Sequence, residues 1–558
     1  MSMSGPDLAK WRQKQIDFLG KLAHKCKPLT TKWFAMISDV PAGVKSLREG
    51  FNVAFLAVLL EAIDWPDKGL YSLLLRGFPL YGDLREHDSH IFRKKSEEEI
   101  EKELPAFNKS LAELHNHDSN LTWLETCESV TMAQSTGTPQ LGKRKESSES
   151  VDINATRENL LFEVYRETQD QESRGFLGPA MTKEKLIARH TVNGVFLARP
   201  LPRFGTNPGF KLNSHGEWVM KARCIDDAKR AGVNAGTLMG ESLVMPTFEF
   251  IARTGAYVCE KSDNSPEFDL LLGLEDMFPA YRRFGNSSVH VSVVAVFNPH
   301  TRAVEYRELH GLPMGNSSSP GHFCRVPEAL SAVAQMFCAA PVAPFVDDYM
   351  MMDRGDTSIS VNGRFWRSSG QWVGNQIHKL TGTPFSPEKH QEGDQTNKAL
   401  GVAADLTEFR TTCTIRFKPT AERCAKLIES MERAESEDYL APRLAESLLG
   451  KLNFTLSACP WGVGRAATQP LINRAGGGRD SAPTTNRSKY RWTAAMAYML
   501  LFFKDLFSNI PHLEFCFRGD GRGKLIIYSD ACQSVFHCGL GVLLIDHNLG
   551  QRWVASCS

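Results

Sequence analysis

Three aspartates stand where the sequence predicts that strands end or turn. Asp276 comes shortly after the apolar run Leu-Leu-Leu-Gly-Leu, and the pair Asp347-Asp348 lies between the apolar segments 344–346 and 349–352. We expect a buried strand before Asp276 and a hairpin with the pair at its turn. Carboxylates held close together repel one another, and divalent cations remove that conflict. Two such ions, about 3.5–4 Å apart, activate an attacking hydroxyl group and stabilise a leaving oxygen, and Mg²⁺ suits that role.

Two interpretations of Asp347-Asp348 are open at this point. Aspartate is common in turns, so the pair by itself favours an ordinary turn. Two more segments lie between Asp276 and the pair: Tyr281 follows Asp276 by five residues, and 312–320 reads Leu-Pro-Met-Gly-Asn-Ser-Ser-Ser-Pro. A single aromatic residue normally fills a core. Residue types alone therefore leave the catalytic interpretation open, and the order and spacing of the segments carry a resemblance to a known family.

In this order the segments resemble the palm motifs of reverse transcriptases of the retrotransposon and retrovirus type. Members of that family carry Asp-x-x-x-Ala-Tyr/Phe, then Leu-Pro-x-Gly-x-x-x-Ser-Pro, then x-x-Asp-Asp. The resemblance covers residues 176–460. It implies that Asp276 and Asp347 are the principal ligands of two Mg²⁺ ions, with Mn²⁺ as an alternative metal. It also implies that Asp348 is the third acidic residue of the site.

The same resemblance assigns the nucleotide pocket. It implies that Tyr281 lies under the sugar and excludes a 2′-hydroxyl group. Pro313 and Gly315 match the segment that packs beside the template and the incoming nucleotide. Met314 stands where family members often have Gln, so nucleotide selection at this position is left open.

Two flanking segments resemble the parts of the family that contact the triphosphate. Residues 221–227, with Asn234, resemble the fingers segment that closes on the nucleotide, and Arg223 is its candidate for a phosphate contact. The alternative for Arg223 is an ordinary surface ion pair with Asp226. The sequence Phe-Ser-Pro-Glu-Lys, which ends at Lys389, resembles the motif that supplies a lysine near the pyrophosphate. Lys389 is therefore a candidate general acid.

The C-terminal segment resembles the first hairpin of a ribonuclease H domain. Ile-Ile-Tyr-Ser-Asp-Ala ends at residue 531 and is followed by Gly-Leu-Gly-Val-Leu at 539–543, with Asp530 in the place of the first metal carboxylate. We expect a two-stranded hairpin in which 524–529 pairs with 539–545. The other carboxylates of a ribonuclease H would come from later elements, so we expect a truncated domain without nuclease activity.

Composition favours a protein of a reducing, intracellular compartment, cytoplasmic or nuclear. The length of 558 residues suggests about two to four domains. The longest apolar stretch, 51–63, contains Asn52 and Glu61 and is too short to span a bilayer, so no membrane partner is expected. Thirteen cysteines without a Cys-x-x-Cys spacing argue against a disulfide framework or a zinc ribbon.

Positive charge is concentrated in two segments, although the net charge is only +1. Residues 176–234 hold ten Lys or Arg against four acidic residues, and residues 441–495 hold eight against two, a net charge of +6 in each case. Basic segments on either side of an acidic centre fit contacts with a phosphate backbone. Two solvated faces are an equally good interpretation of the charge alone.

Apolar patterning divides the chain into successive regions. Val289–Phe297 is the clearest strand and Pro327–Ala339 a predicted helix, and the alternation of strands with helices around them is typical of an α+β fold. We expect a helical N-terminal region at 1–128, a flexible linker at 129–150, fingers and palm at 151–400, a largely helical thumb and connection at 401–510, and a truncated ribonuclease H start at 521–558.

Together these features predict an α+β polymerase of the right-hand type, with fingers, palm and thumb. The expected reaction is that of an RNA-directed DNA polymerase, which adds a dNTP to a primer 3′-hydroxyl on an RNA or DNA template. One alternative is an inactive or domesticated retroelement remnant that binds nucleic acid. A second is a viral RNA-dependent RNA polymerase, but those enzymes usually lack an aromatic gate, so Tyr281 weighs against it. The oligomeric state and the retroelement clade are left open.

Overall fold

The computed structural model of the chain folds into two compact units. The larger unit comprises residues 3–250 and 271–394, and the smaller unit comprises 1–2, 251–270 and 395–558. The residues that the structure describes are 3–136, 153–206, 210–212, 218–220, 222–263, 265–460, 463–476, 490–510, 512–517, 525–533, 538–546 and 551–557.

One four-stranded sheet of the larger unit carries the aspartates, with the strand order β14-β15-β11-β18. β11 (Leu270–Asp276) is buried along its whole length, as its leucines predict. β14 (Val342–Phe345) and β15 (Asp348–Arg354) pair as an antiparallel hairpin, which confirms the hairpin expected around Asp347-Asp348. β18 (Gln391–Asp394) pairs antiparallel with β11. Both aspartate-bearing segments therefore belong to neighbouring strands.

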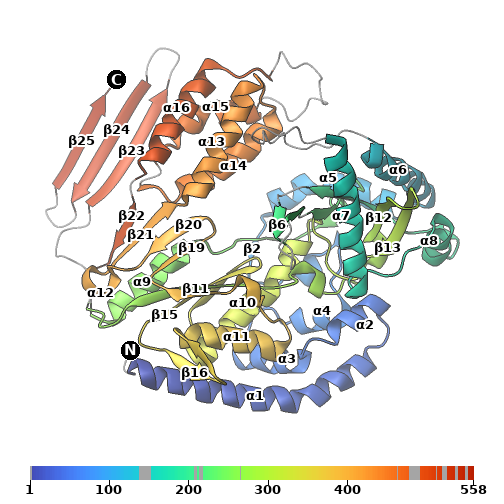
Figure 1. The fold of residues 1–558 in the computed structure, drawn as a ribbon, viewed down its shortest axis with the longest axis horizontal. Coiled ribbons are helices and arrows are strands. Elements are labelled where there is room, and N and C mark those ends of the chain that lie inside the picture. The colour runs from blue at the N-terminus through green and yellow to red at the C-terminus, as the bar shows by residue number, and fades with distance from the viewer. Residues whose placement is uncertain are drawn as a thin grey trace. The chain divides into compact units, whose positions relative to one another are not determined.

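Helices from distant parts of the sequence support this sheet. α10 (Ser319–Cys338) packs on β14, and α11 (Ser369–Thr381) packs on β15. The long helix α1 (Gly5–Met36) runs beside α11 and α3 (Val53–Ala62), as Figure 1 shows. These helices contribute to one continuous hydrophobic core with the strands. The N-terminal helices therefore belong to the same unit as the aspartates.

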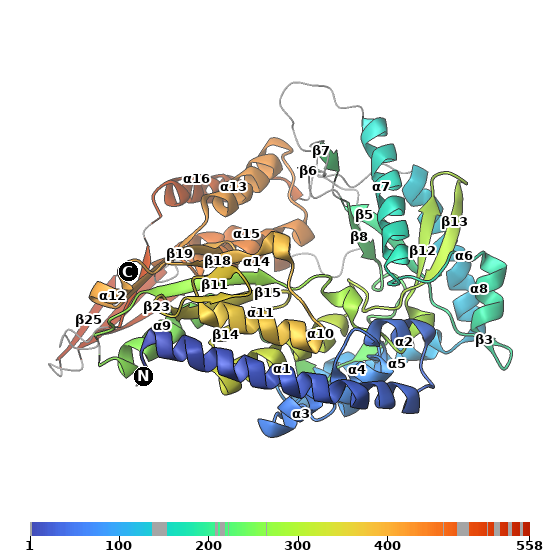
Figure 2. The same ribbon diagram turned by 60° about the horizontal axis from the view of Figure 1, so that its bottom comes forward.

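A second sheet of the larger unit has the order β13-β12-β5-β8. Its strands are β5 (Leu201–Thr206), β8 (Arg223–Asp226), β12 (Val293–Asn298) and β13 (Ala303–Glu308). Helices α6 (His117–Thr136) and α7 (Ile153–Ser173) pack against it, and α7 lies along β5 and β8 in Figure 2.

The remaining elements of the larger unit are short, apart from the 18-residue helix α5 (Glu97–Leu114). They are α2 (Ala42–Arg48), α4 (Leu70–Arg76), α5 (Glu97–Leu114), α8 (Lys183–His190), β1 (Gly82–Asp83), β2 (Arg93–Lys94), β3 (Thr191–Val192), β4 (Val195–Phe196), β6 (Phe210–Leu212), β7 (Trp218–Met220), β9 (Thr237–Leu238), β10 (Glu241–Ser242), β16 (Ile359–Val361), β17 (Arg364–Trp366) and the 3-10 helices η1 (Arg85–His87), η2 (Tyr281–Arg283), η3 (Val289–Val291) and η4 (Pro387–Lys389).

The smaller unit combines a sheet of order β19-β20-β21-β22 with a helical core and a separate sheet β23-β24-β25. Helix α9 (Glu249–Lys261) leads into it. The other elements are β19 (Thr396–Ala399), β20 (Val402–Asp405), α12 (Phe409–Thr412), β21 (Thr414–Pro419), α13 (Ala421–Ser436), α14 (Pro442–Leu456), η6 (Ala466–Thr468), α15 (Gln469–Gly476), α16 (Ala494–Ser508), β22 (Leu513–Cys516), β23 (Leu525–Gln533), β24 (Cys538–Asp546) and β25 (Gln551–Cys557).

The structure corrects the predicted ends of two elements in the larger unit. The strand expected at 289–297 begins at Val293, because pairing with β13 starts there, and the residues before it form η3. The helix expected from Pro327 begins eight residues earlier, at Ser319. Pro320 stands in its first turn, where the missing amide proton costs nothing, and Pro327 lies inside the helix.

Two predictions for the smaller unit are also corrected. The largely helical part of 401–510 begins only at α13, because β20, the short helix α12 and β21 come before it. The pairing of β23 with β24 confirms the C-terminal hairpin, but β25 adds a third strand beside β24. In the described part of the chain, every helix is too short or too polar to cross a membrane.

A buried ion pair fixes α1 to the strand that follows the aspartate pair. The Arg12 guanidinium, 1% exposed, donates to both oxygens of Asp353 on β15 at 2.8 and 2.7 Å and to the Ser369 hydroxyl at 2.9 Å. Arg12 also donates to the carbonyls of Cys338 and Ala339. Burial tends to raise the pKa of Asp353, but Arg12 and hydrogen bonds lower it overall.

We expect Arg12→Met to reduce the free energy of unfolding by about 3–5 kcal/mol, because the Asp353 carboxylate would stay buried without its counter-ion. Urea denaturation followed by circular dichroism measures this loss. Lys10→Met, an exposed change on the same helix, serves as the control. Adding Asp353→Asn to Arg12→Met should recover part of the loss. A loss below about 1 kcal/mol, typical of a surface pair, would contradict the assignment.

Candidate active site

The three predicted aspartates meet where β11 ends beside the β14–β15 turn. Asp276 is the last residue of β11, and Asp347 lies in the turn between Phe345 and Asp348, which are paired in the hairpin. The amide of Met277 donates to the Asp347 carbonyl at 2.8 Å and so joins the strand end to the turn. One local backbone contact thus brings together residues about 70 positions apart in the sequence.

Electrostatic effects among the carboxylates show how close they are. Burial raises the pKa of Asp348 to about 6, and the charges of Asp347 and Asp276 add to the effect. The pKa of Asp347 is also raised, first by burial and then by Asp276, while Lys389 and Arg223 oppose the rise. The site therefore concentrates negative charge on carboxylates that are only partly exposed to water. Such a cluster favours cations or protons.

The two carboxylate oxygens of Asp276 have different surroundings. Lys389 Nζ donates to Asp276 Oδ2 at 2.6 Å. Asp276 Oδ1 is buried and, among the described residues, has no hydrogen-bond partner. An unsatisfied anionic oxygen beside two more carboxylates fits a divalent cation.

The protein side chains do not by themselves surround such an ion. In the described part of the chain, no group of three or more His, Cys, Asp or Glu side chains is gathered closely enough to hold a metal ion. Mg²⁺ commonly takes one or two protein carboxylates and completes its shell with water and substrate phosphates. The residues present therefore fit metal ions that are held jointly with a nucleotide.

Lys389 reaches Asp276 because its segment is attached to the end of β11. It ends the short helix η4, and the amide of Ser386 donates to the Asp276 carbonyl at 2.8 Å. Met277 and Phe385 form an isolated β-bridge in the same place. The Lys389 side chain is 52% exposed, so backbone attachment rather than packing places it.

A second ion pair lies directly beside the first and was not predicted from the sequence. His390 Nδ1 lies 2.7 Å from Glu275 Oε1, and this hydrogen bond is the main reason that the pKa of His390 is raised. Gln371 Nε2 on α11 donates to the same Glu275 oxygen at 3.0 Å. The only local signal was that Glu275 and His390 each adjoin a predicted site residue.

The Tyr281 side chain is partly buried next to the carboxylates. Its ring stacks on Phe323 of α10, with 4.7 Å between ring centroids and 21° between planes. Burial raises the pKa of Tyr281, and the neighbouring Cys324 and Asp347 add to the rise. One face of the Tyr281 ring is thus packed on Phe323, and the ring is close enough to Asp347 for its charge to affect the tyrosine.

The turn that contains the other predicted pocket residues is held against β8. Pro313 is buried, and Met314 is 50% exposed. Gly315 has a φ of +102°, and a Cβ atom there would lie 2.9 Å from the Asp226 carbonyl oxygen, so this position requires glycine. Asn234 donates to the Gly315 carbonyl and accepts from the Ser317 amide, each at 2.9 Å.

Behind this turn lies a buried triad of one carboxylate and two guanidinium groups. Arg203 donates to Asp226 Oδ1 at 2.7 Å, and Arg282 donates to Asp226 Oδ2 at 2.7 Å. Arg282 follows Tyr281 in the chain. The triad therefore links β5, β8 and the segment that carries the tyrosine.

The triad corrects two expectations about charge. Arg223, at the start of β8, is exposed, and Asp226 is occupied by Arg203 and Arg282, so the alternative pairing of Arg223 with Asp226 is wrong. Arg199 and Arg203 are buried, so part of the positive charge of 176–234 lies inside the unit. That part is not available to a phosphate backbone.

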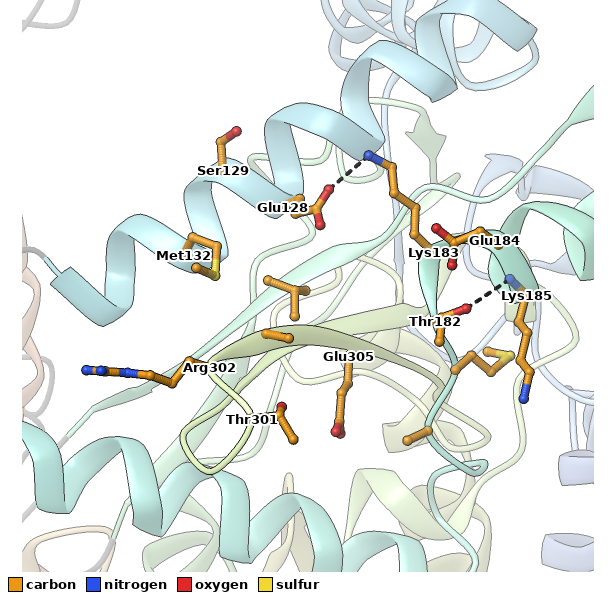
Figure 3. Close-up of a pocket in the computed structure, with 14 residues that line it drawn as sticks. Glu128, Ser129, Met132, Thr182, Lys183, Glu184, Lys185, Thr301, Arg302 and Glu305 are labelled. Carbon is orange, nitrogen blue, oxygen red and sulfur yellow. Dashed lines mark hydrogen bonds and ion pairs between the residues drawn. The ribbon is translucent and has the colours of Figure 1, made fainter.

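A pocket of about 860 Å³ lies elsewhere in the larger unit (Figure 3). α6, the start of α8 and the turn between β12 and β13 line it, and the Lys183–Glu128 ion pair of 2.9 Å crosses its rim. None of the site residues predicted from the sequence lines this pocket. The candidate active site is therefore the carboxylate cluster and not this cavity.

We expect Asp226→Asn to destabilise the protein by about 3–5 kcal/mol at pH 7, because two guanidinium groups would lose their buried counter-ion. Burial opposes ionisation of Asp226, but the two arginines lower its pKa to about 2. A lowered pKa contributes stability above the unfolded value near 3.8, and that stability is lost as pH falls toward 2. The difference between parent and variant should therefore narrow below pH 4.

Urea titrations between pH 7 and pH 3 measure this difference. Asp227→Asn, at the neighbouring and less buried aspartate, is the control and should change stability little. A difference between parent and Asp226→Asn that stays constant as pH falls would contradict the role of the charge.

Comparison with known proteins finds matches only among solved structures. No protein-family model and no curated protein matches the chain. Among solved structures, a foamy viral protease–reverse transcriptase in complex with double-stranded DNA is similar at 13% sequence identity and a TM-score of 0.40. The match covers 76% of this chain and 58% of that one, so the chain spans less than two thirds of that protein. A likeness this low says nothing about the function of this chain.

Proposed function

We propose that the chain is an RNA-directed DNA polymerase of retroelement origin. The observation that carries the proposal is the meeting of Asp276, Asp347 and Asp348 where β11 ends beside the β14–β15 turn, with a buried Asp276 oxygen that has no hydrogen-bond partner among the described residues. The reaction is attack of a primer 3′-hydroxyl on the α-phosphate of a dNTP, with pyrophosphate as the leaving group. An RNA or DNA template with its primer is the nucleic-acid partner.

In this proposal the three aspartates hold two Mg²⁺ ions, or Mn²⁺ ions, together with the nucleotide phosphates. Bound ions activate the attacking hydroxyl group and offset charge on the leaving oxygen. Asp276 and Asp347 are the principal ligands, and Asp348 is the third acidic residue. The raised pKa of Asp348, about 6, supports a site that needs positive charge to stay fully ionised near neutral pH.

Basic side chains serve the triphosphate. Lys389 Nζ, placed beside Asp276, gives a proton to the leaving pyrophosphate as it exchanges its carboxylate partner for a phosphate oxygen. Arg223 is exposed on β8, and its positive charge lowers the pKa of Asp347. Arg223 is therefore near enough to the carboxylates to contact the phosphates of a nucleotide bound there.

The remaining pocket residues select the nucleotide. Tyr281, stacked on Phe323, presents a fixed ring that clashes with a 2′-hydroxyl group. Pro313, Met314 and Gly315 form the turn beside the template and the incoming base. The exposed Met314 side chain is free to contact the nucleotide.

In this proposal the elements of the chain form the parts of a right-hand polymerase. The sheet with β11 and β15 is the palm, and the sheet with β5 and β8 is the fingers. Helices α13 to α16 of the smaller unit are the thumb and connection. The strands β23 to β25 are the start of a ribonuclease H domain; the side chain of Asp530 lies outside the described residues.

We expect Asp347→Asn to lower the rate of primer extension by about 10²–10³-fold or more, because stabilisation of charge in the transition state is lost. Affinity for primer–template should change little. Single-turnover extension and a fluorescence-anisotropy binding titration separate the two effects. Asp356→Asn, an exposed aspartate of the same unit, is the matched control. Extension at the parent rate by Asp347→Asn would exclude Asp347 as a catalytic metal ligand, whereas absence of extension by the unaltered protein would leave a nucleic-acid-binding remnant as the better account.

We expect Tyr281→Ala to raise ribonucleotide incorporation relative to deoxyribonucleotide by about 10- to 100-fold, because a steric clash is removed. Tyr281→Phe keeps the ring and should keep the selectivity of the parent. The measurement is the ratio of kcat/KM for each rNTP and its dNTP. If the alanine variant discriminates as well as the parent, Tyr281 is part of the core and not a gate.

A further inference from the structure

Two adjacent residue pairs connect the end of β11 to the segment that carries Lys389. Asp276 pairs with Lys389, and the preceding residue, Glu275, pairs with the following residue, His390. Successive side chains of a strand point to opposite faces, so Glu275 lies on the face of β11 away from Asp276. The second pair thus holds the Lys389 segment from the side remote from the carboxylate cluster.

The Glu275–His390 pair is buried and well connected. The Glu275 side chain is 0% exposed and that of His390 is 14% exposed. Gln371 donates to Glu275 at 3.0 Å and to the Gln391 carbonyl at 2.9 Å, and it accepts from the Gly393 amide at 2.9 Å. Gln391 and Gly393, which follow His390 in the chain, are thereby fixed to helix α11.

The His390 ring also has a defined orientation. The Trp366 ring, buried on β17, meets it edge to face, with 5.3 Å between centroids and 79° between planes. The other ring nitrogen lies 3.4 Å from Glu392, at the edge of hydrogen-bonding distance. Packing against Trp366 and the hydrogen bond to Glu275 therefore fix the orientation of the His390 ring.

The Lys389 side chain has less support than that of His390: it has the ion pair with Asp276, and its segment is attached to β11 through Ser386 on its N-terminal side. The lysine side chain is 52% exposed, whereas its partner Asp276 is 8% exposed. A long and mostly solvated lysine keeps a defined position only if its backbone is held. A displacement of a catalytic group by about 1 Å can cost about 10²-fold in rate.

We propose that His390 is a positioning residue for Lys389: its hydrogen bond to Glu275 anchors the backbone that aims the lysine ammonium group at the reacting phosphates. This inference rests on the proposed polymerase function. His390 makes no contact with the substrate in this account and acts through Lys389 alone. Its loss should lower the rate of nucleotide addition and leave the affinities for dNTP and primer–template unchanged.

The test is a double-mutant cycle in the full chain, measured by single-turnover primer extension. His390→Phe keeps a ring against Trp366 and removes the hydrogen-bond donor, so it should slow nucleotide addition by about 10- to 100-fold. His390→Asn returns a donor near the position of Nδ1 and should recover most of that loss. Glu392→Gln, which alters the other side of the ring, is the matched control and should stay within about twofold of the parent rate.

The decisive comparison uses Lys389→Met. If His390 acts through Lys389, His390→Phe should have almost no further effect on the rate in the Lys389→Met background. Additive losses, or a loss confined to dNTP affinity, would overturn the positioning role while leaving the polymerase proposal intact. Absence of extension by the unaltered protein would overturn both.

A thermal melt of each variant guards against a general folding defect. If His390→Phe does not fold, Glu275→Gln replaces it in the same cycle, because the neutral amide weakens the hydrogen bond to His390. Loss of extension by Glu275→Gln that is additive with Lys389→Met would likewise overturn the inference.

Discussion

Three carboxylates held together away from full contact with water repel one another, and the rest of the larger unit has to hold them in place against that repulsion. The raised pKa values of Asp347 and Asp348 record the cost. Lys389 offsets part of it at Asp276. The backbone meets the constraint with a strand end and a tight turn joined by a hydrogen bond between Met277 and Asp347. Such a cluster has a clear use only when cations complete it.

Buried ion pairs join the segments that carry this cluster to other parts of the larger unit. Arg12 binds Asp353 on β15 of the hairpin, the Arg203–Asp226–Arg282 triad lies next to the turn at Gly315, and Glu275 binds His390 beside Lys389. Apolar side chains of the same volume in place of such ion pairs would often leave the protein equally stable or more stable. Ion pairs with hydrogen bonds of fixed direction instead restrict the arrangement of the elements that they join. We regard them as the means by which separate segments are held in one geometry.

Much of the local structure around the candidate site was predictable from local patterns. A run of leucines predicted β11, apolar residues on both sides of Asp347-Asp348 predicted the hairpin, and fixed spacing singled out Tyr281. The ion pairs were not predictable, because their partners lie far apart: 341 residues separate Arg12 from Asp353. The start of β12 was misplaced since strand ends depend on where a partner begins, and that information is not local. Arg203 was counted as surface charge because composition does not reveal burial.

Template-directed synthesis by the purified, unaltered chain tests the central claim most directly. Primer extension with Mg²⁺ and four dNTPs, on RNA and DNA templates of different sequence, measures it. The account predicts products whose sequence is complementary to the template supplied and whose formation stops when the divalent cation is chelated. A folded protein that binds primer–template and extends it on neither template would contradict the account, and it would leave the carboxylate cluster without the role assigned to it.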